Sequence, residues 1–180
     1  MQKYSVVLFL TGLLAFTTFS CEKVEEFTQF DLNYTASVTI PATAGINLPF
    51  DLFTPDIETD SESKFAVEDT RKELLQEVKL TKMDLTITSP DDQRFDFLKE
   101  ITVYIDAEGL GELIIAEKKE IPDNIGAELS LDVSENDIQE YIKKDGFKLR
   151  VNTVTDEALS EAINIDIATT FFVDAKVFGQ

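Results

Sequence analysis

The clearest structural signal in the chain lies at residues 30–40, which read FDLNYTASVTI. Apolar side chains occupy every even position from Phe30 to Ile40, and polar side chains occupy every odd one. This period of two is typical of a β-strand with one buried and one solvated face. Sheets with one solvated face are usually antiparallel. The segment therefore predicts an antiparallel sheet whose first strand ends before Pro41.

The same alternation recurs along the rest of the chain. Further strands are predicted at residues 78–88, 101–106, 113–116, 127–133, 147–153 and 163–173, with turn residues between them. Within 78–88 the apolar phase changes between Leu80 and Met83, which indicates a bulge near Thr81 and Lys82. These segments make about seven strands, and we expect a mainly β protein, an antiparallel Ig-like β-sandwich. A β-barrel is the alternative, since a strand count fits both.

One short helix is expected between two of these strands. Ser134 is a favourable N-cap residue, and Gly146 is a favourable residue at a helix exit. Between them, Ile138 and Ile142 fall on one helical face. A second short helix is expected within residues 67–77.

A long connection follows the first strand, at residues 42–64, and it carries an apolar group. The group consists of Ile46, Leu48, Phe50, Leu52 and Phe53. We expect these side chains to form a short edge strand or to pack the connection onto the core, because exposed apolar patches are uncommon on monomers. The alternative is a binding loop with exposed aromatic side chains.

The order of elements after Leu80 resembles a known β-sandwich. The resemblance rests on LTITSP at 85–90, ITVYI at 101–105, the Ile121-Pro122 step and the short helix after the strand at 127–133. Over about 100 residues the chain is similar to the late-embryogenesis-abundant "water stress and hypersensitive response" domain. This resemblance implies a sandwich fold and a role in binding or protection, with no catalytic residues.

The N-terminus has the layout of a secretory signal. Lys3 is followed by an uncharged run from Val6 to Phe19, which is too short to span a bilayer as a helix, and then by Ser20 and Cys21. This segment resembles the precursor of a bacterial lipoprotein, in which a peptidase cuts before a cysteine that carries a diacylglycerol. The resemblance implies lipid attachment at Cys21. The alternative is an ordinary signal peptide whose cysteine is incidental.

The lipoprotein resemblance divides the chain into three parts. Residues 1–20 are the expected signal peptide, residues 21–26 a lipidated acidic spacer, and residues 27–180 a single sandwich domain, a size that buries a sufficient core. The acidic spacer resembles the export tag of surface lipoproteins in Bacteroidota-type bacteria. We therefore expect an exported protein anchored by lipid in the outer membrane, with display at the cell surface or in the periplasm both open.

The charge and composition of the chain argue against several classes of function. The chain has 35 acidic and 16 basic residues and a formal net charge of −19. So acidic a protein is not expected to bind nucleic acid, which requires clustered Lys and Arg. The chain contains no His. It therefore lacks both the commonest general base and the commonest ligand of transition metals.

An alternating acidic run offers a candidate calcium site. Its residues are Asp56, Glu58, Asp60 and Glu62. Calcium prefers such hard oxygen ligands, but the sixth and twelfth positions of an EF-hand-like loop are here Ser61 and Val67 instead of Gly and Glu. We therefore expect a solvated acidic loop and no cofactor, with a weak calcium site as the alternative.

These observations favour a non-enzymatic envelope lipoprotein. We expect it to be tethered to the membrane through Cys21 and to bind a protein or glycan partner. Two alternatives stay open: a calcium-binding sandwich that uses the residues named above, and a small carbohydrate-active hydrolase with two neighbouring carboxyl groups in a cleft.

Overall fold

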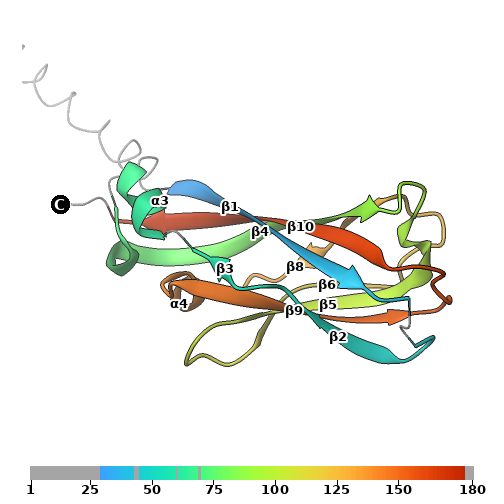
Figure 1. The fold of residues 1–180 in the computed structure, drawn as a ribbon. Coiled ribbons are helices and arrows are strands. Elements are labelled where there is room, and N and C mark those ends of the chain that lie inside the picture. Colours follow the sequence, from blue (N-terminus) through green and yellow to red (C-terminus); the bar gives the residue numbers. More distant parts are fainter. Residues whose placement is uncertain (1–28, 43–44, 60, 69, 177–180) are drawn as a thin grey trace, which may run out of the picture.

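A computed structural model describes residues 29–42, 45–59, 61–68 and 70–176, which form a sandwich of two antiparallel sheets (Figure 1). One sheet has four strands in the order β1-β10-β4-β7. The other has six: β2-β9-β5-β6-β8, with β3 also paired to β9. The strand bounds are β1 Gln29–Ile40, β2 Pro49–Phe53, β3 Ile57–Glu58, β4 Leu75–Ser89, β5 Leu98–Asp106, β6 Leu113–Lys119, β7 Glu128–Ser130, β8 Asp132–Val133, β9 Gly146–Thr155 and β10 Ile163–Ala175.

The mainly β, antiparallel sandwich expected from the sequence is confirmed, and the two layers do not close into a barrel. The described residues form more strands than the seven or so expected because several pairings, such as those of β3 and β8, are only two residues long. The short helices are α3 (Ser61–Val67) and α4 (Gln139–Ile142), with 3₁₀ turns η3 (Lys72–Leu74) and η4 (Phe95–Phe97).

The core lies between the two sheets and begins with the alternation of β1. Leu32, Tyr34, Val38 and Ile40 are buried, while the residues between them are exposed or half-buried. The Tyr34 ring meets Phe147 of the opposite sheet edge to face, with ring centroids 5.5 Å apart. Such buried aromatic contacts hold two layers at a fixed spacing. The predicted inward face of the first strand is therefore confirmed.

The bulge expected in β4 is also confirmed. On β10, Thr170 lies opposite Lys82, but its neighbour Phe171 lies opposite Leu80. Thr81 is thus the extra residue. The bulge lets both Leu80 and Met83 point into the core, which explains the change of phase in the sequence.

The alternating run at 127–133 does not form one strand. β7 pairs with β4 in the four-stranded sheet, whereas β8 pairs with β6 in the six-stranded sheet. Between them, the N–H of Leu131 donates to the carbonyl of Met83 at 3.0 Å. The chain crosses from one layer to the other here, and its side chains keep their alternation because both short strands bury the same phase.

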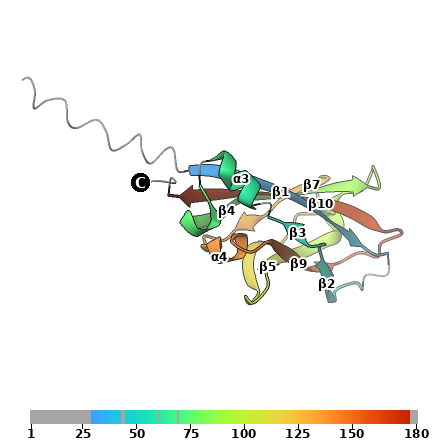
Figure 2. The same cartoon turned by 60° about the vertical axis from the view of Figure 1, so that its left-hand side comes forward.

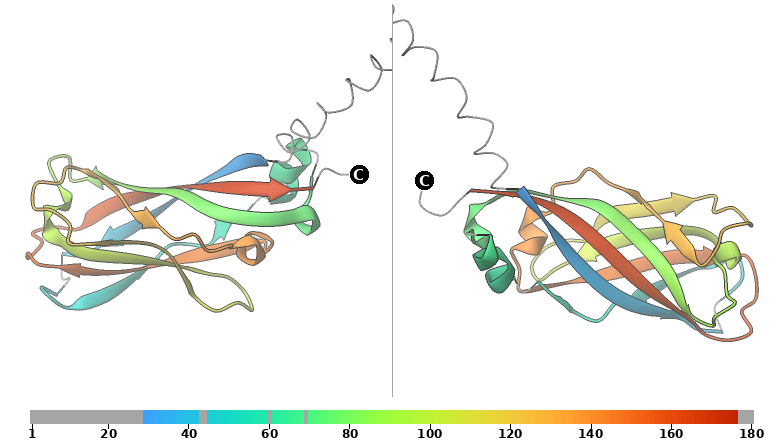
Figure 3. Two further views of the ribbon diagram at one scale, coloured as in Figure 1. Left: turned by 180° about the vertical axis from the view of Figure 1, so that it is seen from behind. Right: turned by 90° about the horizontal axis from the view of Figure 1, so that it is seen from above.

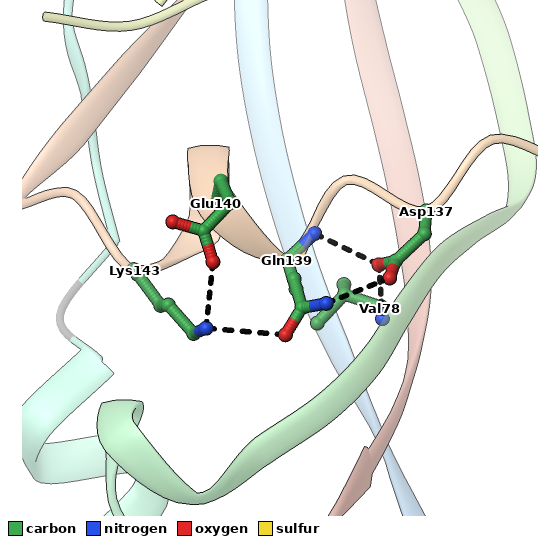
Figure 4. Close-up of polar contacts among 5 residues, drawn as sticks. All are labelled: Val78, Asp137, Gln139, Glu140 and Lys143. Atoms are coloured by element: carbon green, nitrogen blue, oxygen red, sulfur yellow. Dashed lines mark hydrogen bonds and ion pairs between the residues drawn. The ribbon is translucent and has the colours of Figure 1, made fainter. Parts of the chain in front are cut away.

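The helix expected to begin at Ser134 begins instead at Gln139. The N–H of Ser134 donates to the Ile115 carbonyl at 2.8 Å, so pairing with β6 holds this residue outside the helix. Asp137 replaces it: its Oδ1 accepts from the N–H groups of Gln139 and Val78, each at 3.0 Å (Figure 4). Asp137 lies just before the N-cap, Ile138, and its carboxylate links the first residue of α4 to β4.

The short helix expected within residues 67–77 is present only as the 3₁₀ turn η3, Lys72–Leu74. α3 ends at Val67, and β4 already begins at Leu75. Pairing with β10 overrides the local helical preference, because it buries Leu75 and Val78 in the core. Within the expected acidic loop at residues 56–62, Ile57 and Glu58 form β3, and α3 begins at Ser61.

The start of β1 and the end of β10 lie side by side at one end of the sandwich, next to α3 (Figures 2 and 3). Gln29 is paired with Asp174 there. The described strands and the core they enclose lie between Gln29 and Ala175. A chain that starts at residue 22 therefore contains this fold in full. No helix of the described part is both long and apolar enough to cross a membrane.

Candidate functional site

Exposed apolar side chains gather on the six-stranded sheet. Among the described residues, five large apolar side chains are exposed, and four of them lie on this sheet or on the connection that leads into β2. They are Ile46 (46% exposed), Leu48 (64%), Phe53 (62%) and Ile114 (41%). The fifth, Val67, lies on α3. In so acidic a protein this gathering marks a candidate binding surface.

Both sequence expectations for the 42–64 connection hold in part. β2 is an edge strand of the six-stranded sheet and pairs with β9, as expected. Its Phe50 and Leu52 are half-buried against the core. Phe53 and the preceding Leu48, however, are exposed, as in the alternative of a binding loop. The edge strand therefore has one packed face and one open face.

The strand register builds a row of side chains across the outer face of the sheet. Phe53 of β2 lies opposite Arg150 of β9, Arg150 opposite Tyr104 of β5, and Tyr104 opposite Ile114 of β6. Directly paired residues point to the same face of a sheet. The centre of the row is a stacked pair, in which the Arg150 guanidinium lies 3.8 Å from the centre of the Tyr104 ring.

Arg150 is held in place by two carboxylates. Its Nε and Nη2 donate to the two carboxylate oxygens of Glu112, each at 2.7 Å, which makes a bidentate pair. Its Nη1 donates to Oδ1 of Asp51 at 2.7 Å, and Asn152 donates to the same oxygen at 2.8 Å. The guanidinium therefore joins β2, β5, β9 and the turn before β6 on one face.

These contacts shift the protonation equilibria of all three groups. The hydrogen bond from Arg150 holds the pKa of Glu112 below its usual value. Hydrogen bonds from Asn152 and then Arg150 lower the pKa of Asp51. The Glu112 carboxylate in turn raises the pKa of Arg150, although partial desolvation opposes it. The cluster therefore keeps its charges at neutral pH and presents a fixed surface.

This cluster was not found from the sequence, because its members are far apart in the chain. Asp51, Tyr104, Glu112 and Arg150 come from different strands and turns. The only local signal was the alternation in FKLRVNT at 147–153, which places Arg150 on the outward phase. That phase identifies an exposed arginine but says nothing of its partners.

The calcium candidates lie elsewhere, beside β3. Asp56 forms an ion pair with Lys148, with Oδ1 and Nζ 3.4 Å apart. Asp56 and Glu58 line an open hollow of about 720 Å³ together with Asp106, Glu108, Asp145 and Lys148. Asp60 lies outside the described residues, and so does the side chain of Glu62. In the rest of the described chain no three acidic side chains converge closely enough to hold a metal ion. The calcium site remains a prediction.

The lipid attachment site also lies outside the described residues. Cys21 precedes Gln29, where the description begins. Lipidation at Cys21 and the boundaries at residues 20 and 26 therefore remain predictions.

The comparisons with known proteins find distant structural similarity to several β proteins. No protein-family model matches the chain, and no curated protein matches its sequence. Among solved structures, a CBM32 module from Clostridium perfringens in complex with GalNAc-β-1,3-galactose is similar at 8% identity and a TM-score of 0.38, over 80% of this chain and 97% of the other. FLHE is similar at 8% identity and a TM-score of 0.30, over 81% of this chain and 98% of the other. The desmodium yellow mottle tymovirus protein is similar at 8% identity and a TM-score of 0.29, over 84% of this chain and 91% of the other. Similarities this distant do not bear on function.

Proposed function

We propose that this protein is a non-enzymatic, lipid-anchored envelope protein whose sandwich docks a protein partner through the outer face of its six-stranded sheet. The observation that carries the proposal is the row in which the exposed apolar side chains of Phe53 and Ile114 flank the clamped Arg150 and Tyr104. A protein interface needs an apolar area that loses water on binding, with an aromatic or arginine anchor near its centre.

The geometry favours a protein over a glycan as the partner. A sugar site needs an open aromatic face and free hydrogen-bond donors beside it. The guanidinium of Arg150 covers one face of the Tyr104 ring, and three of its five N–H donors are engaged by Glu112 and Asp51. At the two ends of the row, Phe53 and Ile114 are exposed and apolar. Such a surface gains most from burial against another protein.

The anchor supports a role beside a membrane. Eight peptide units separate Cys21 from Gln29, and such a length spans at most about 28 Å. The end of the sandwich where β1 begins would therefore stay near the bilayer. The strands run away from that end (Figure 1), so the outer face of the six-stranded sheet would stand upright and meet a neighbouring membrane protein from the side.

Site-specific photo-cross-linking in the native cell tests the proposal. A photoreactive phenylalanine derivative is placed at Phe53 or Ile114 on the docking face, and at Val67 on α3 as a matched exposed control. We expect positions 53 and 114 to capture one and the same protein, position 67 to capture none of it, and Cys21→Ala to reduce the yield. Equal capture at all three positions, or none on intact cells, would contradict the proposed surface.

A further inference from the structure

β1 is an edge strand of the four-stranded sheet, and no other described strand pairs with its outer side. β1 pairs with β10 along all 12 residues without a register shift, and β10 in turn pairs with β4. The strand has no proline and no bulge, and Asp31 is its only charged residue. Prolines, bulges and charged side chains are the features by which proteins usually keep an edge strand unpaired, and β1 has almost none of them. An unprotected edge of this length is a template for another strand.

The direction of the backbone groups of β1 follows from the pairing of β10. The backbone carbonyl of Thr170 accepts a hydrogen bond from the Thr81 hydroxyl of β4 at 3.1 Å, so the backbone N–H and C=O groups of Thr170 point toward β4. The backbone groups of the preceding residue, Thr169, therefore point toward β1, where Thr169 is paired with Tyr34. Alternation then turns the N–H and C=O groups of Asn33, Thr35 and Ser37 away from β10. Within the described part of the chain these backbone groups have no hydrogen-bond partner.

A hollow of about 500 Å³ lies directly beside this edge. It is lined by residues 33–37 of β1, by residues 55–58 around the start of β3, and by Lys64 of α3. Since five consecutive residues of β1 line it and none of β10 does, it lies on the open side of the strand. The hollow therefore offers room for side chains of an added strand, between the edges of the two sheets.

The charges around the hollow select among possible occupants. Asp56 and Glu58 line it together with one cation, Lys64, and Asp56 also forms an ion pair with Lys148, which is not part of the lining. A second copy of this chain, paired through β1 about a two-fold axis, would bring two sets of these carboxylates together in a protein whose net charge is already −19. An extended segment that carries Lys or Arg meets no such repulsion.

We propose that the open edge of β1 binds an extended basic peptide segment of another protein by strand addition. The segment pairs with the outward N–H and C=O groups of Asn33, Thr35 and Ser37, and its Lys or Arg side chains face Asp56 and Glu58. Main-chain hydrogen bonds supply affinity in this mode, and flanking side chains supply specificity. The site is separate from the outer face of the six-stranded sheet, and it stands whether or not that face docks a partner.

The test begins with a displayed library of random ten-residue peptides, selected on purified residues 22–180. We expect the enriched peptides to be basic and rich in β-branched residues. A synthetic copy is then titrated against variants by fluorescence polarisation. Thr35→Pro removes one outward N–H and leaves the ladder with β10 intact, and it should weaken binding at least tenfold, whereas Thr35→Ala should not.

Charge reversal gives a second, independent readout that does not depend on a proline in the strand. Glu58→Lys should weaken binding of the basic peptide at least tenfold, while Glu157→Lys in the loop before β10 should not change it. Amide exchange of Thr35 and Ser37 should slow in the complex. The proposal is overturned if no peptide is enriched, if the enriched peptides are not basic, or if Thr35→Pro and Glu58→Lys bind as well as the wild type. A dimer that Thr35→Pro dissociates would also overturn it, in favour of a second copy as the occupant.

Discussion

The hydroxyl of Tyr34 donates a hydrogen bond to the backbone carbonyl of Thr59 at 2.8 Å. This bond joins the edge strand of one sheet to the segment after β3 at the edge of the other. Thr59 is itself fixed by the turn after α4, because its N–H donates to the Asp145 carbonyl at 3.0 Å and its hydroxyl to the Lys144 carbonyl at 2.8 Å. One buried tyrosine thus connects both layers near the hollow beside β1.

Tyr34→Phe removes this bond and leaves the aromatic packing in place. We expect the free energy of unfolding to fall by about 1–2 kcal/mol, because the Thr59 carbonyl loses a buried donor. Denaturant unfolding measures the change, with Thr39→Ala on the solvated face of β1 as the control. If Tyr34→Phe unfolds at the wild-type midpoint, the bond contributes nothing and the layers are held by packing alone.

Two substitutions near the start of α4 should have different effects on stability. Asp137→Ala removes the acceptor for the N–H groups of both Gln139 and Val78, and we expect a loss of about 1–2 kcal/mol of stability. Ser134→Ala should change stability by less than about 0.5 kcal/mol, since the buried Ser134 hydroxyl has no partner within the described residues. Thermal melts of both variants check this. The reverse order of effects would mean that Ser134 caps the helix after all.

The two faces of β2 respond differently to a charge. Phe50 packs against the core and Phe53 is 62% exposed, because the two lie three positions apart and therefore on opposite faces of the strand. We expect Phe50→Asp to cost about 2 kcal/mol or more, because an unpaired carboxylate would enter an apolar site. Phe53→Asp should stay within about 0.5 kcal/mol of the wild type. Equal losses in urea unfolding would show that Phe53 is buried and cannot serve as a docking residue.

The Arg150 cluster gives the protein a defined acid response. The folded-state pKa values of Asp51 and Glu112 are both lowered, chiefly by hydrogen bonds from Asn152 and Arg150 respectively. Their contribution to stability is therefore complete at neutral pH and is lost as the pH falls through these depressed values, below about pH 4. NMR titration of the side-chain carboxyl groups checks the assignment. Arg150→Gln should move both pKa values upward. Unchanged values would mean that the guanidinium does not pair with these carboxylates in solution.

The fold was largely predictable because its strongest signals are local. The alternation from Phe30 to Ile40 places every inward residue of β1, and the change of phase between Leu80 and Met83 locates the bulge. Ser134 failed as a cap because a partner 19 residues away, Ile115, binds its N–H, and no local pattern records such competition.

The candidate surface was less predictable, for a related reason. The apolar group in the 42–64 connection was visible in the sequence, but which of its members turn outward depends on the pairing of β2 with β9. The carboxylates that hold Arg150 come from residues 51 and 112, and only the strand register brings them together. Alternation predicts the face on which a residue lies, whereas contacts on that face are set by the topology.

The most direct test of the docking surface measures the affinity of the protein captured by cross-linking at positions 53 and 114. That partner is purified and titrated by calorimetry against the wild-type sandwich, against Phe53→Asp, and against Val67→Asp as an exposed control on α3. We predict that Phe53→Asp weakens binding at least tenfold and that Val67→Asp leaves it unchanged. Wild-type affinity in Phe53→Asp would contradict the assignment of the outer face of the six-stranded sheet as the docking surface.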